Sequence, residues 1–105
     1  MTDKELLELA AKAAKYETWS DKIYFRIHRN GRWVDWNPIK VDGDALQLAV
    51  KLRIEIAFSE DPDGEETAIA QYGKWAWRGV SMEQDPYAAT RRAIVIAAAE
   101  LAKNK

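Results

Sequence analysis

The dipeptide Asn30-Gly31 decides how the residues on either side of it can pair in a β-sheet. A two-residue loop of type I′ needs positive φ at both central positions, and Asn followed by Gly adopts that conformation readily. Residues 22–28 alternate between polar and apolar side chains, as a strand with one buried face does. The sequence therefore predicts a β-hairpin that turns at Asn30-Gly31.

This turn fixes the register of the hairpin. It places Arg29 opposite Arg32, His28 opposite Trp33 and Arg26 opposite Asp35. Directly opposed residues share a face. The face predicted to enter the core holds Ile23, Phe25, Ile27, Val34 and Trp36, and the other face holds Lys22, Tyr24, Arg26, His28, Trp33 and Asp35.

Helices are predicted at both ends of the chain and in its middle. The Thr-x-x-Glu spacing of a capping box precedes an apolar stripe, which predicts a helix to about Lys15. Asp42-Gly43-Asp44 offers caps for a second helix. Asp85 followed by Pro86 is typical of an N-cap and first helical residue, and predicts a helix to about Lys103.

Two further regions are predicted to be strands. Residues 54–58 alternate in polarity and lead into an acidic turn, Asp61-Pro62-Asp63-Gly64. Residues 67–80 form either one bulged strand or a hairpin turning at Tyr72-Gly73. The hairpin is favoured, because it sets small residues beside large ones: Ala70 opposite Trp75 and Ala68 opposite Trp77.

These elements define an α+β chain of the order αββαβββα, with residues 1–105 in a single domain. Forty-eight percent of the residues are apolar and 31% are charged, the balance of a folded globular protein. Few faces of the predicted strands carry side chains polar enough to be exposed to water. We therefore expect a mainly antiparallel sheet of four or five strands, covered by helices on both faces as an α/β/α sandwich.

A family resemblance rests on three segments: Trp36-Asn37-Pro38, residues 44–52 and residues 85–94, together with the alanine-rich residues 9–14. In these the chain resembles small phage and prophage proteins of the phage ABA-sandwich type. The resemblance implies a sheet between helices and a phage or prophage origin. It implies no activity and no catalytic residue.

The residue inventory argues against catalysis. The chain has no cysteine and one histidine, so hydrolytic triads and His-Cys metal clusters lack their parts. There is no Gly-x-Gly-x-x-Gly and no Walker loop. We expect no enzyme activity, no cofactor and no metal, and we expect His28 to be a polar strand residue beside Trp33. Trp75 and Trp77 are interpreted as core residues or as an exposed platform.

A candidate partner-binding face lies on the first hairpin, where cations alternate with aromatic rings and Asp35 can pair with one of them. Its residues are Tyr24, Arg26, His28, Arg29, Arg32 and Trp33. Accessory proteins of this size act most simply by binding another protein, which is the function expected here. The alternative is a nucleic-acid-binding protein that uses residues 22–34, since single strands are held by cations beside stacking rings.

Double-stranded RNA is a poorer fit, although residues 44–103 follow the element order αβββα. The last helix starts with Asp85-Pro86-Tyr87 rather than with lysines, and five acids lie between Glu60 and Glu66.

The sequence also predicts where the protein is located and whether it can self-associate. A net charge of −1, no cysteine, no long apolar run and no leader pattern favour the cytoplasm of a bacterial host and no membrane contact. Residues 93–99 are apolar without a break, so they cannot all face one sheet. Either the first helix covers the surplus face, or a second copy does so in a homodimer.

Overall fold

The computed structural model describes residues 1–60, 62–72, 76–82 and 84–103, and of residues 76–78 only the backbone. The described elements follow the order αβββαβββα. They are α1 (Asp3–Ala13), β1 (Thr18–Ser20), β2 (Phe25–Arg29), β3 (Arg32–Asp35), α2 (Asp42–Leu52), β4 (Glu55–Glu60), β5 (Glu66–Tyr72), β6 (Ala76–Ser81) and α3 (Pro86–Lys103). The mixed α and β class is as predicted, with one more strand, β1, than the sequence pattern indicated.

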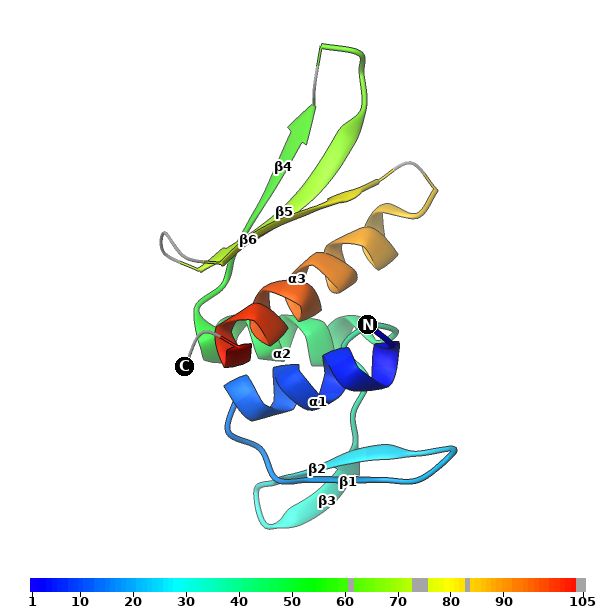
Figure 1. Cartoon of the computed structure of the whole chain (residues 1–105), viewed down its shortest axis with the longest axis vertical. Helices are drawn as coiled ribbons and strands as arrows, with labels where there is room; N and C mark the ends of the chain where they lie inside the picture. The colour runs from blue at the N-terminus through cyan, green and yellow to red at the C-terminus, as the bar shows by residue number, and fades with distance from the viewer. Residues whose placement is uncertain (61, 73–75, 83, 104–105) are drawn as a thin grey trace.

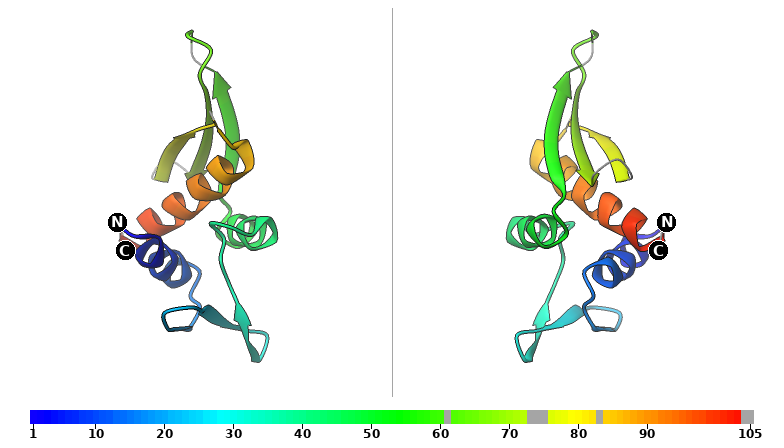
Figure 2. Two further views of the ribbon diagram at one scale, coloured as in Figure 1. Left: turned by 90° about the vertical axis from the view of Figure 1, so that its right-hand side faces the viewer. Right: turned by 90° about the vertical axis from the view of Figure 1, so that its left-hand side faces the viewer.

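The strands form two antiparallel sheets, so the predicted single sheet of four or five strands is wrong. One sheet has the order β1-β2-β3 and the other the order β4-β5-β6. The molecule is 47 Å long, and along this longest axis the helices lie between the two sheets (Figure 1). The views from the sides show α3 against one face of the β4–β6 sheet and no described helix against the other (Figure 2). Helices on both faces of one sheet are therefore not confirmed.

The chain passes from one sheet to the other through residues 37–41 and then α2. The backbone N–H of Asn37 donates to the Asp44 carboxylate at 2.9 Å, which ties the end of β3 to the first turn of α2. Pro38 is fully buried and has no N–H for a sheet ladder. The strand thus ends at Asp35, and α2 carries the chain across the helical layer before β4 begins.

The first hairpin is confirmed in turn and register. Asn30 and Gly31 have φ of 53° and 80°, and the pairs Arg26 with Asp35, His28 with Trp33 and Arg29 with Arg32 are as predicted. The additional strand β1 pairs with the other edge of β2 and sets Trp19 opposite Arg26.

Residues 67–80 form a hairpin, as favoured, but its predicted register is wrong. Ala70 lies opposite Arg78 and Ala68 opposite Val80. Pairing continues to Tyr72 with Ala76, so three residues rather than two separate the strands. Each partner on β6 therefore lies three residues further along the chain than predicted. Trp75 lies outside the described residues, as does the side chain of Trp77, so both readings of these tryptophans stay predictions.

Local caps explain where the helices begin. Thr2 and Glu5 form the predicted capping box of α1, and the Asp85 carboxylate accepts hydrogen bonds from the first turn of α3 at 3.0 and 3.1 Å. The caps predicted at Asp42-Gly43-Asp44 are wrong. The N-cap of α2 is Val41 without a side-chain hydrogen bond, because Asp44 bonds to Asn37 instead.

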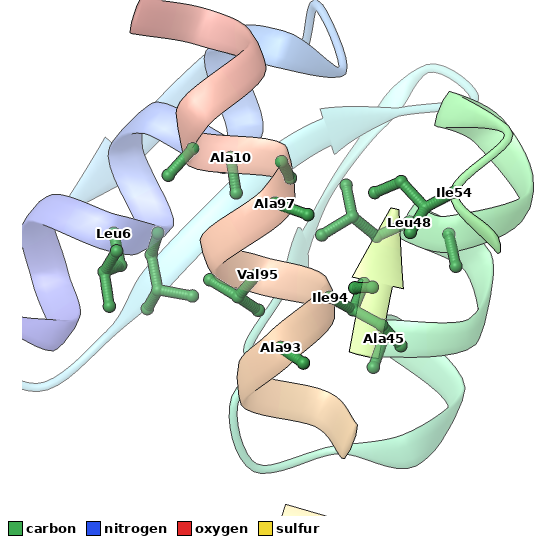
Figure 3. Close-up of a cluster of buried hydrophobic side chains, with 14 of the residues drawn as sticks. Leu6, Ala10, Ala45, Leu48, Ile54, Ala93, Ile94, Val95 and Ala97 are labelled. Carbon is green, nitrogen blue, oxygen red and sulfur yellow. The ribbon is translucent and has the colours of Figure 1, made fainter. Parts of the chain in front are cut away.

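Helix α3 runs through the centre of the core and contacts α1, α2, β5 and β6. Many of its buried residues are alanines, which let neighbouring helices approach closely. Figure 3 shows Val95 on the side toward Leu6 of α1, and Ile94 on the side toward Leu48 of α2. The surplus apolar face of the last helix is therefore covered within the chain. None of the described helices is both long and apolar enough to span a lipid bilayer.

Candidate binding face on the β1–β3 sheet

The outer face of the β1–β3 sheet, turned away from the helices, gathers polar and aromatic side chains. Opposed residues share a face, so the pairs Trp19 with Arg26, Arg26 with Asp35 and His28 with Trp33 place all five side chains together. Tyr24 joins them from the residue before β2. We call Trp19, Tyr24, Arg26, His28, Trp33 and Asp35 the aromatic face.

Arg26 stands at the centre of the aromatic face. Its Nε donates to Asp35 Oδ1 at 2.8 Å. The guanidinium carbon lies 4.7 Å from the ring centroid of Tyr24 and 5.6 Å from that of Trp19, within the range of a cation–π interaction. These contacts hold the long side chain in one position beside exposed rings.

A hollow of about 250 Å³ opens between the two tryptophans, and it is lined by Trp19, Arg26 and Trp33. Each tryptophan keeps 48% of its surface exposed. The His28 ring lies beside Trp33 with its centroid at 5.1 Å in an edge-on arrangement, as the sequence predicted. The result is a preformed, largely aromatic recess with a cation in its lining.

Two of the predicted site residues lie elsewhere. Arg29 is one residue beyond His28, so it is on the opposite face of β2, where its guanidinium donates to Gln47 of α2. Arg32 is the partner of Arg29 across the strands and shares that opposite face. The structure thus brings together Tyr24, Arg26, His28 and Trp33 and separates Arg29 and Arg32 from them, because side chains alternate along a strand.

Trp19 is the residue that sequence reasoning missed. Its strand has three residues, too few to show an alternating pattern. A weak signal is present nevertheless, since Thr18 and Trp19 are residue types enriched in strands. The backbone N–H of His28 donates to the Glu17 carbonyl at 3.0 Å, so the chain lies alongside β2 from Glu17 onward.

A carboxylate turn positions Tyr24. Asp21 accepts hydrogen bonds from the backbone N–H groups of Tyr24 at 2.7 Å and of Ile23 at 2.8 Å. These bonds favour the ionised form and lower the pKa of Asp21, with the bond from Tyr24 contributing most. The turn returns the chain from β1 to β2 with the Tyr24 ring beside Arg26.

Comparisons with protein-family models, with curated proteins and with solved structures give no match to this chain. Within the described ranges, no group of three or more His, Cys, Asp or Glu side chains is arranged to hold a metal ion.

Proposed function

We propose that this chain is a non-enzymatic binding domain that contacts another protein through the aromatic face. The observation that carries the proposal is the recess between two half-exposed tryptophans, with Arg26 held in its lining. Tryptophan, tyrosine and arginine dominate the binding energy of protein interfaces, and they do so best where they are positioned before the partner arrives.

The charges of the aromatic face favour a protein over a nucleic acid. Arg26 is paired with Asp35, and Arg29 is bonded to Gln47 on the far side of the strand. Nucleic-acid binding depends on cationic side chains that neutralise phosphates and displace the counterions condensed on them, whereas both arginines already have partners within the chain. The alternative, a single-stranded nucleic acid, is favoured by one observation only, the exposed rings of Trp19 and Trp33 on which bases could stack.

The origin and location of the protein belong to the same proposal. The resemblance of its sequence to phage ABA-sandwich proteins supports an accessory role for a phage or prophage, in the cytoplasm of a bacterial host. The absence of cysteine from the sequence suits that reducing compartment.

Affinity capture with matched variants tests the proposal. Immobilised chain is incubated with bacterial lysate, and bound proteins are quantified for the wild type, for W19A/W33A and for Y87A. Tyr87 is a control because it is 72% exposed on α3, away from the β1–β3 sheet. Loss of one hot-spot residue costs about 2 kcal/mol, or roughly 30-fold in affinity. We expect the specific partner to be retained by Y87A and lost by W19A/W33A. Equal capture by all three chains would contradict the proposal.

The nucleic-acid alternative has its own measurement. Fluorescence anisotropy with a labelled single-stranded oligonucleotide is recorded for the wild type and for R26A/R29A/R32A over a range of salt concentrations. We expect no specific binding by either chain. Binding that weakens with salt and is lost in the triple variant would replace the protein partner with a nucleic acid.

A further inference from the structure

Strand β4 is an open edge of the second sheet. All six of its residues are exposed, among them Ile56 at 38% and Phe58 at 62%. These two lie opposite Ala70 and Ala68, which are fully buried in the core beneath α3. Ile56 and Phe58 therefore stand on the α3 side of the sheet, but beyond the part that the helix covers.

The backbone of this edge is also available. A strand at the edge of a sheet presents unpaired N–H and C=O groups, and natural edges are usually protected by lysine, proline or a bulge. Residues 55–60 contain neither lysine nor proline and pair with β5 without interruption. The right-hand view of Figure 2 shows β4 in front, with no described element over it.

We propose that β4 pairs with β4 of a second copy of this chain, antiparallel and about a two-fold axis, so that the two sheets become one. Pairing centred on Ala57 places Ile56 opposite the partner's Phe58, and Phe58 opposite the partner's Ile56. The four apolar side chains then share one face, in the space between the two α3 helices. This proposal does not depend on the aromatic face or its partner.

The charges at the two ends of β4 indicate a second copy as the occupant. Glu60 lies directly opposite Glu66, an arrangement of like charges that destabilises a strand pair. Arg53, at the other end of the strand, has an exposed side chain and φ of 59°. Antiparallel pairing centred on Ala57 sets Glu60 opposite the partner's Ile54, one residue from the partner's Arg53. Each copy thus offers a cation where the other has its acid pair.

The proposed surface differs from the one that the sequence suggested. The apolar run of the last helix leaves open cover by the first helix or by a second copy, and the structure shows that α1 and α2 cover it. Ile56 and Phe58 of β4 are exposed apolar side chains at this sheet.

Sedimentation equilibrium across a micromolar dilution series measures the oligomeric state. We expect the wild type to approach twice the chain mass of 12.0 kDa at the higher concentrations. F58E should sediment as a monomer, because it sets two carboxylates in the shared apolar face. I23E is the matched control, since Ile23 is 81% exposed at the opposite sheet and the variant should still dimerise. A wild-type mass of one chain throughout, or dimers of F58E, would overturn the proposal.

Charge reversal tests the register without changing the apolar residues. R53E and E60R each make both end contacts repulsive in a homodimer, so each should sediment as a monomer. An equimolar mixture restores an attractive pair at both ends and should form heterodimers. Circular dichroism of each chain checks that it is folded. Failure of the two folded variants to associate on mixing, while the wild type dimerises, would reject this register and with it the proposed β4 pairing.

Discussion

The Glu5 carboxylate accepts hydrogen bonds from the backbone N–H of Thr2 at 3.3 Å and from its hydroxyl at 3.0 Å. In return, the backbone N–H of Glu5 donates to the Thr2 hydroxyl oxygen at 3.1 Å. The hydroxyl bond, followed by the backbone bond, lowers the pKa of Glu5 below its ordinary value. The cap at the start of α1 is therefore stabilised when the Glu5 carboxyl group is ionised.

This reciprocal cap predicts a pH dependence. The folded pKa of Glu5 is lower than the unfolded pKa, so its contribution to stability is present above the unfolded value and is lost as pH falls through the folded one. A two-dimensional NMR titration of the side-chain carboxyl should therefore give a midpoint below that of an unstructured glutamate. In T2V, which removes the hydroxyl, the midpoint should rise. The same midpoint in T2V and wild type would show that the hydroxyl bond has no such effect.

At the scale of single elements, the β2–β3 hairpin depends on the backbone of its turn. Gly31 has φ of 80°, and a Cβ added there would meet no atom within 4 Å. Gly43, in the first turn of α2, likewise has open space around it but carries no positive φ. The two glycines have the same open space but differ in φ, so comparing substitutions at them isolates the effect of backbone conformation.

Alanine at these two positions should change stability in opposite directions. G31A forces a side chain into the left-handed region and should lower the free energy of unfolding by about 1 kcal/mol. G43A restricts the unfolded chain without strain and should raise it by about 0.4–1 kcal/mol. Urea denaturation followed by circular dichroism measures both. Unchanged stability in G31A, or a loss of stability in G43A, would contradict this assignment of the effect to backbone φ.

The strongest signals confined to a few residues were readable in the sequence, whereas contacts between distant elements were not. Asn30-Gly31 specified a turn and its register, and Asp85 with Pro86 specified a helix start, since each acts within a few residues. The assignment of β1–β3 and β4–β6 to separate sheets depends on packing between elements that are far apart in the sequence, which no local pattern encodes. For the same reason the aromatic face was predicted without Trp19.

At the scale of the whole molecule, one core joins both sheets. Ile27 of β2 and Ala70 of β5 belong to the same buried cluster, with α2 and α3 between them. Leu48 of α2 is among the largest fully buried side chains described. Truncation of the Leu48 side chain should therefore lower the stability of the entire fold rather than of one sheet.

Leu48→Ala tests the continuity of this core. Removing a buried leucine side chain should lower the free energy of unfolding by about 2–5 kcal/mol. Leu46 is the matched control, because it is 59% exposed on the same helix and L46A should change stability by less than about 0.5 kcal/mol. Urea unfolding of L48A followed by circular dichroism and by tryptophan fluorescence should show one coincident transition. Two separate transitions would mean that the sheets unfold independently.

The placement of the helices between the two sheets has a thermodynamic consequence for the surfaces at either end. Effects of substitutions at distant sites without shared partners add, within about 0.3–0.5 kcal/mol. The exposed side chains of Trp33 and Phe58 belong to different sheets that have the helical layer between them, so the effects of substitutions at the two sites should add. Over evolutionary time, the sequence of one surface can therefore drift or adapt without compensating substitutions in its counterpart.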